Sequence, residues 1–75
     1  KDYGRAVDVF EKVLSDHPDA NFLDVILFNY GRCLYKLKKK PEARQKFEHL
    51  IRDYPESDIA TEANKIVEAL KKAGF

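Results

Sequence analysis

The chain repeats one set of residues at a fixed separation of 37 positions. The repeated residues are Ala6, Phe10, Glu11, Asp16 and Pro18, which return as Ala43, Phe47, Glu48, Asp53 and Pro55. A period between roughly 20 and 50 residues is typical of proteins that stack copies of one small supersecondary unit. Such a unit cannot bury its apolar face alone, so the units stack and present extended surfaces. The repeat therefore favours a binding or assembly module over an enzyme.

Length and charge narrow the class of protein further. The 75-residue chain has room for one domain, and a domain of this size buries only about 60% of its unfolded surface. Its net charge of +1 gives no general attraction to nucleic acid or to membranes. No apolar run approaches the roughly 18 residues of a spanning helix. The single cysteine excludes an internal disulfide and a metal site made of several cysteines.

Glycines and prolines are few, and they fall where helices are expected to end. Between them, apolar residues recur every three to four positions, which predicts helices over about 4–16 and 22–38. A third helix is expected from the first turn at Pro41 to Pro55, and a fourth from a cap at Ser57 or Asp58 to Gly74. Asn21 is expected to cap the second helix. No stretch alternates with a period of two residues, so the predicted class is all-α.

Each predicted helix has one apolar face that is expected to pack inward. These faces comprise Ala6, Phe10, Val13, Leu14 and His17 in the first helix, Leu23, Ile26, Leu27, Tyr30, Leu34 and Leu37 in the second, Ala43, Phe47, Leu50, Ile51 and Tyr54 in the third, and Ile59, Ala63, Ile66, Val67 and Leu70 in the fourth. The spacing of these residues matches one side of an α-helix. The four faces together predict a single small core.

The second and third predicted helices carry a spaced motif, Leu27-x2-Tyr30-Gly31-x2-Leu34, then Ala43-x3-Phe47, then Pro55. It resembles the pattern of the tetratricopeptide repeat family, Trp-x2-Leu-Gly-x2-Tyr, Ala-x3-Phe and Pro. Leu, Tyr and Leu replace the family's Trp, Leu and Tyr, and these large apolar replacements preserve the packing. The resemblance implies antiparallel helix-turn-helix units stacked into an α-solenoid. It also implies that extended peptides or partner helices are received in a concave groove.

The register of this family divides the chain into three parts. Residues 1–20 are expected to form half a repeat, residues 21–57 a full repeat, and residues 58–75 a C-terminal capping helix. The chain is therefore expected to begin halfway through a unit and to be the C-terminal segment of a larger protein. The stretch 53–57 further resembles bacterial envelope members, such as periplasmic Tol–Pal accessory proteins and outer-membrane β-barrel assembly lipoproteins. That resemblance implies a location in the bacterial periplasm or cell envelope.

No arrangement of nucleophile, base and orienting group is recognisable in the sequence, so no catalytic residue, cofactor or metal is predicted. Cys33 lies between core positions and is expected to be a buried structural thiol. His17 occupies the repeat position of Tyr54, so it is expected to pack at a helix tip. His49 is expected on the surface.

A second stripe on the helix over 22–38 lies away from its core face. It comprises Val25, Phe28, Asn29, Arg32, Tyr35 and Lys36, and the resemblance places it in the concave groove. Lys65 of the fourth helix is expected to extend this surface. Aromatic side chains together with an arginine are typical anchors of protein interfaces. The predicted partner-binding residues are therefore Phe28, Asn29, Arg32, Tyr35, Lys36 and Lys65, and packing of Phe28 and Val25 against an upstream helix is the second interpretation.

A basic run covers the turn after this helix and comprises Lys36, Lys38, Lys39 and Lys40, with Arg44 and Lys46 beyond. Basic clusters can contact nucleic-acid phosphates or anionic lipid, but only Tyr35 supplies a nearby base-stacking ring. We interpret the run first as a solvated turn. The leading functional prediction is a module that binds a protein or peptide partner. Homo-oligomerisation or scaffolding of an envelope complex is the main alternative, and docking of nucleic acid or lipid is the third.

Overall fold

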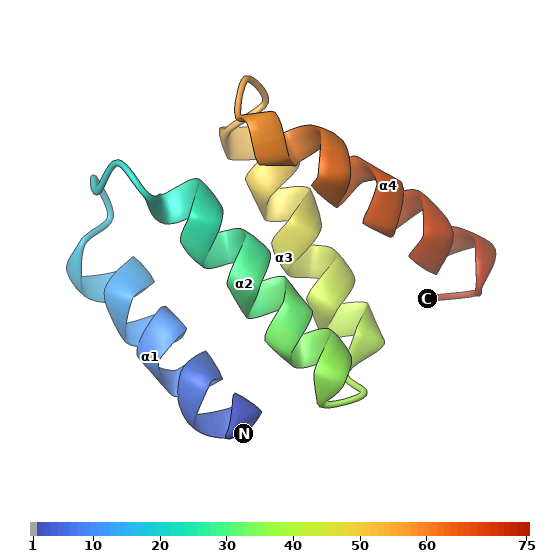
Figure 1. Ribbon diagram of the computed structural model, residues 1–75, viewed down its shortest axis with the longest axis horizontal. Coiled ribbons are helices and arrows are strands. Elements are labelled where there is room, and N and C mark those ends of the chain that lie inside the picture. Colours follow the sequence, from blue (N-terminus) through green and yellow to red (C-terminus); the bar gives the residue numbers. More distant parts are fainter. Residues whose placement is uncertain (1) are drawn as a thin grey trace.

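The computed structural model describes residues 2–75, and these residues form four helices and no strand. The helices are α1 (Tyr3–Asp16), α2 (Leu23–Lys36), α3 (Lys40–Asp53) and α4 (Asp58–Lys72). Consecutive helices pack on each other and run in opposite directions, and α2 also contacts α4 (Figure 1). The all-α prediction is confirmed, and each helix begins and ends close to its predicted limits. Lys1, with which the expected half repeat begins, lies outside the described residues.

The core lies between α2, α3 and α4. Its buried residues are Leu23, Leu27, Tyr30, Leu34, Ala43, Phe47, Leu50, Ala60, Ala63, Val67 and Leu70. All of these except Ala60 were predicted from the spacing of apolar residues. By contrast, α1 has no buried residue, and it adds only partly buried side chains such as Phe10 and Leu14 to the edge of the core.

Gly31 determines how closely α2 and α3 approach. It is buried, and a Cβ atom at this position would lie 2.7 Å from Cζ of Phe47. Such a distance is far shorter than ordinary contact between carbon atoms. The hydrogen of Gly31 therefore leaves the space that the Phe47 ring fills. This contact is a physical reason for the glycine in the motif Leu27-x2-Tyr30-Gly31-x2-Leu34.

The two predicted helix caps have different outcomes. Ser57 caps α4 as expected, since its Oγ accepts a hydrogen bond from the Ile59 N–H at 3.4 Å. The same hydroxyl donates to Oδ2 of Asp24 at 2.6 Å, which ties the start of α2 to the start of α4. Asn21 does not cap α2, so that prediction was wrong. The residue before α2 is Phe22, which provides no side-chain cap.

Two residues predicted to face inward lie at helix ends and are exposed instead. Leu37 follows α2 and is 36% exposed, because the chain turns toward α3 at this point. His17 follows α1, and its side chain is exposed while its backbone N–H donates to the Val13 carbonyl at 2.9 Å. Both residues are the first after their helix ends, where the helix no longer holds the side chain against its neighbour; Tyr54, at the same position after α3, is packed against the core.

Candidate functional site

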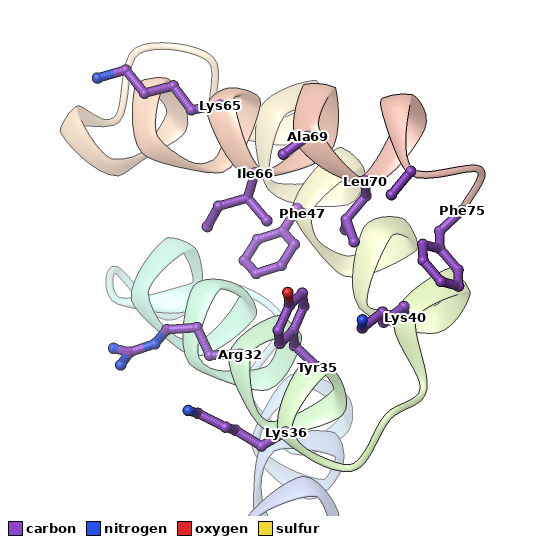
Figure 2. A pocket seen from close by; sticks show the side chains of 11 residues that line it. Arg32, Tyr35, Lys36, Lys40, Phe47, Lys65, Ile66, Ala69, Leu70 and Phe75 are labelled. Carbon is purple, nitrogen blue, oxygen red and sulfur yellow. The ribbon is translucent and has the colours of Figure 1, made fainter.

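A cavity of about 390 Å³ opens between α2 and α4, above the middle of α3. Its floor is apolar and consists of Phe47 from α3 with Ile66 and Leu70 from α4. The rings of Tyr35 and Phe75 form its aromatic wall, as Figure 2 shows. We call this cavity, together with the side chains around its mouth, the groove.

Four basic side chains surround the mouth of the groove. They are Arg32, Lys36, Lys40 and Lys65, and the described residues that line the cavity include no carboxylate side chain. Lys65 lies 3.6 Å from a carboxylate oxygen of Glu62, whereas within residues 2–75 the other three have no carboxylate at ion-pair distance. The groove is therefore a basic ring around an apolar floor.

Phe75 is held in place as the wall of the groove. Its backbone N–H donates to the Leu70 carbonyl at 2.8 Å, and its carbonyl accepts from Nη1 of Arg44 at 3.0 Å. Nζ of Lys40 lies 5.1 Å from the ring centre of Phe75 and 5.1 Å from that of Tyr35. An ammonium group at this distance from an aromatic ring is attracted to it. Lys40 thus links the two aromatic sides of the wall.

The structure brings four of the six predicted partner-binding residues to this groove. Arg32, Tyr35, Lys36 and Lys65 line it. Phe28 does not, because its half-buried ring packs edge-on against Phe47 with ring centres 5.6 Å apart.

Asn29 lies outside the groove and beside a second, smaller hollow. This hollow of about 260 Å³ lies between α1 and α2 and is lined by Tyr3, Asn29, Arg32, Cys33 and Lys36. The Asn29 side chain donates to the Val25 carbonyl at 3.0 Å, one turn earlier in the same helix. Arg32 and Lys36 line both hollows, so they form a basic ridge between them.

Sequence reasoning missed Phe75 as part of the groove. The available signal was Gly74, which has a φ of +91° and follows α4 as a helix-ending residue. A glycine at this position turns the chain back over the last turn, and the next residue often makes an apolar contact there. Phe75 does so, and its ring closes one end of the groove.

The thiol and the histidines lie away from the groove floor. Cys33 is half-buried rather than fully buried as predicted, and burial raises the pKa of its thiol. His49 is half-buried on α3, with Nε2 2.8 Å from Oδ2 of Asp53. Within residues 2–75, no three His, Cys, Asp or Glu side chains gather closely enough to hold a metal ion. None of the helices in the described part of the chain is long and apolar enough to cross a bilayer.

The core residue Tyr30 has an unusual ionisation. Burial raises the pKa of its hydroxyl to about 12, and the neighbouring carboxylates of Glu11 and Asp8 add to this effect. Its ring stacks on Phe10 of α1 with centres 6.2 Å apart. Tyr30 is therefore a structural link between α1 and α2, and its hydroxyl is poorly suited to proton transfer near neutral pH.

Residues 26–57 match the tetratricopeptide repeat family. The matched stretch contains most of α2, all of α3 and the turn that leads into α4. No curated protein and no solved structure matches the chain. The expected family resemblance is thus supported over this stretch, and the fold is a helical repeat. The finer expectation of a bacterial envelope subtype has no support from these comparisons.

Proposed function

We propose that the chain is a protein-interaction module that binds a peptide or a helix of a partner protein in the groove. Tetratricopeptide repeats generally mediate protein–protein interaction and are typically not enzymes. The single observation that carries the proposal is the apolar cavity between α2 and α4 with its basic mouth. No chemical step is required of the groove.

The size and composition of the groove support this proposal. Its volume of about 390 Å³ falls within the range of about 300–1,000 Å³ that is usual for ligand sites. Tyr35 is 43% exposed at its mouth, next to Arg32. Tyrosine and arginine are enriched among the side chains that contribute most to binding energy. In this proposal Tyr35 supplies apolar contact, and Arg32 orients the ligand through hydrogen bonds to carboxylate or main-chain carbonyl groups.

A displayed library of random peptides tests the proposal. Peptides selected on the immobilised chain are added to isotopically labelled protein, and the shifted backbone amide signals are mapped. We expect the largest shifts around the groove, and the Arg32→Ala variant should fold normally but bind about 1–3 kcal/mol more weakly. The matched control neutralises Lys38 and Lys39, which belong to the basic run but do not line the groove. This control should change mainly the association rate and its salt dependence.

The opposite pattern of affinities would identify the basic run, and not the groove, as the binding site. Unchanged affinity for Arg32→Ala, together with lost affinity after neutralisation of Lys38 and Lys39, would place binding on the turn. A library that yields no peptide shifting the amides around the groove would reject the proposed function.

Self-association through α1 is the second candidate function, and a specific observation favours it. No residue of α1 is buried, and Val9 is 54% exposed on this helix. A second copy that covered this face would remove apolar surface from water. Light scattering at several protein concentrations tests this candidate, since a monomer at all concentrations would reject it.

The expected setting of the module forms a further part of the proposal. We assign residues 58–75 as a capping helix because Glu68 and Lys71 of α4 are exposed and lie 3.6 Å apart as an ion pair. A polar outer face of this kind is what ends a helical stack in water. A position at the C-terminal end of a larger repeat protein, and a role in a bacterial envelope complex, are tested by reading the gene that encodes the chain.

A further inference from the structure

We infer that the groove takes an acidic segment of a partner protein, in which one apolar side chain enters the cavity and carboxylate side chains on both sides meet the basic mouth. This inference rests on the proposed function and adds the chemistry of the partner.

The charge of the groove favours an anionic ligand. Arg32, Lys36, Lys40 and Lys65 line the cavity, and no Asp or Glu side chain of residues 2–75 lines it, although Lys65 lies 3.6 Å from Glu62, which is not a lining residue. A cavity lined by charges of one sign concentrates ligands of the opposite sign. A neutral peptide would offer these cations only carbonyl oxygens, which accept hydrogen bonds but leave the positive charges unbalanced in a partly dry site. Carboxylates would instead accept charge-assisted hydrogen bonds from them.

The floor favours an apolar side chain over a nucleobase. Ile66, Ala69 and Leu70 of α4 offer no hydrogen-bonding side-chain atom, and Phe47 offers only its ring. Reading a base requires hydrogen-bond donors and acceptors at its edges, and the side chains of the floor supply none. A leucine or phenylalanine side chain matches these surroundings better. The apolar floor therefore identifies a peptide as the occupant rather than nucleic acid.

The placement of the cations indicates where the carboxylates lie. Figure 2 shows Arg32 and Lys36 on one side of the cavity and Lys40 beside Phe75 on the other. Lys65 lies on α4, and its side chain extends toward the same side of the view as those of Arg32 and Lys36. A single carboxylate at the end of a peptide reaches only one of these sides. Carboxylate side chains before and after an inserted apolar residue reach both, so a free C-terminus is not required.

Four peptides of equal length, three of them blocked at both ends, test the inference by calorimetry on the intact chain. The reference has acetylated and amidated ends and the sequence Gly-Glu-Asp-Leu-Asp-Glu-Gly. The second has Gln and Asn in place of Glu and Asp, and the third has Ser in place of Leu. The fourth keeps the reference sequence but has a free C-terminal carboxylate. We expect the second and third peptides to bind at least about tenfold more weakly than the reference, and the fourth to bind within about twofold of it.

Protein variants locate the binding. Lys36→Gln removes a groove cation, and we expect a loss of about fivefold or more in affinity for the reference peptide. Lys38→Gln is the matched control. It also removes one positive charge, but Lys38 lies two residues beyond Lys36 and its side chain does not line the groove. Affinity of the control should stay within about twofold of the unaltered chain at physiological salt. An equal loss in both variants would show general charge attraction and would overturn the inference.

The remaining outcomes separate this inference from the proposed function. If the displayed library selects neutral or basic peptides that shift the groove amides, the inference fails while the proposed function stands. If it selects no groove binder, both fail. If the fourth peptide, with its free C-terminal carboxylate, binds about tenfold more tightly than the reference, the groove prefers a chain end. That result would overturn the inference that the acidic segment needs no free C-terminus. Tighter binding of vesicles of anionic lipid, or of a single-stranded oligonucleotide, through Lys36 would overturn the choice of a peptide.

Discussion

Gly31 and Phe47 form the contact that fixes the distance between α2 and α3. The Phe47 ring is 1% exposed and occupies the space where a Cβ of residue 31 would lie, 2.7 Å from its Cζ. The same ring also packs edge-on against Phe28, and it forms part of the groove floor. The residue that allows the two helices to pack is therefore connected to the candidate site through a single side chain.

We expect Gly31→Ala to destabilise the chain by about 1–3 kcal/mol, because the added methyl group must displace the Phe47 ring from a packed core. Urea unfolding followed by circular dichroism measures this change. Gly4→Ala is the matched control, since its Cβ would lie 3.6 Å from the nearest atom, Oδ1 of Asp2, on an exposed part of α1. The control should be neutral, or stabilising by up to about 1 kcal/mol. Equal stability of both variants would contradict the proposed packing at Gly31.

Tyr30 should make the stability of the fold depend on alkaline pH. Burial raises the pKa of its hydroxyl to about 12, while in the unfolded chain it ionises near about 10. Between these values the unfolded state has released the proton and the folded state retains it, so stability falls as pH rises from about 10 to 12. We expect a loss of up to about 2 kcal/mol.

The Tyr30→Phe variant isolates this effect from the titration of the lysines. It removes the ionising hydroxyl and keeps a ring that can stack on Phe10. As pH rises from about 10 to 12, the free energy of unfolding in urea should fall for the unaltered chain relative to the Tyr30→Phe variant. This relative fall is expected only if the pKa of Tyr30 differs between the folded and unfolded states. Parallel pH profiles for the two proteins would contradict the raised pKa.

At the scale of the helices, the turn between α2 and α3 contains a strained residue. Lys38 has a φ of +65°, and the N–H groups of Lys38 and Lys39 donate to the carbonyls of Tyr35 at 3.0 Å and Leu34 at 2.9 Å. This pair of bonds is the Schellman ending of a helix, in which glycine usually occupies the left-handed position. The end of α4 shows the same pattern with Gly74 in that position.

Lys38→Gly should therefore stabilise the chain by about 0.5–1 kcal/mol. A left-handed conformation costs an L-residue roughly 1–2 kcal/mol, and the greater freedom of glycine in the unfolded chain offsets part of this gain. Lys38→Ala serves as the control, because it removes the same positive charge while keeping a Cβ atom. Thermal unfolding of the two variants should show a higher melting temperature for glycine than for alanine. A lower melting temperature for glycine would show that the left-handed position at residue 38 is not strained.

The helices could be predicted from the sequence because local signals agree with one another. Apolar spacing, the prolines after α1 and α3, and Gly74 after α4 all mark the same limits. The groove was predicted in part, since Arg32, Tyr35 and Lys36 share one face of α2 by spacing alone. The same spacing also put Phe28 on this face, but Phe28 does not line the groove. Its position lies between the two faces, and its contact with Phe47 depends on how deeply that ring enters the space beside Gly31.

The contribution of Phe75 depends on contacts between distant parts of the chain. Its carbonyl bonds to Arg44, which is 31 residues away, and its ring lies beside Lys40. Neither partner follows from the spacing along α4. Ser57 and Asp24, which join the starts of α4 and α2, are another long-range pair that the sequence did not reveal. The sequence therefore predicts the elements better than the contacts that complete the groove.

At the scale of the whole molecule, the four described helices form a thin stack with unequal burial. The stack measures 34 × 30 × 16 Å, with α1 at one edge and α4 at the other (Figure 1). All buried residues lie in α2, α3 and α4, and none lies in α1. In stacked repeats, stability is roughly a sum of unit and nearest-neighbour contributions. α1 has only α2 as a packing partner, so it should open more readily than the rest.

Native-state hydrogen exchange should reveal this difference. We expect the backbone amides of α2 and α3 to exchange about tenfold or more slowly than those of α1, because helices with few buried contacts open locally without unfolding the whole domain. Exchange is measured at low protein concentration, so that any second copy is dissociated. Equal protection in all the helices would show that α1 unfolds only together with the core, and would contradict the packing described for it.

Repeating the exchange at increasing protein concentration connects this prediction with self-association. If a second copy covers the exposed face around Val9, protection of α1 should rise with concentration, because association stabilises the bound form by mass action. If the chain binds partners only through the groove, protection of α1 should not change. The reference peptide should then slow exchange in α2 and α4, whose side chains line the groove, and leave α1 unaffected. The helix whose protection responds, and the component that causes the response, therefore distinguish the two candidate functions in one measurement.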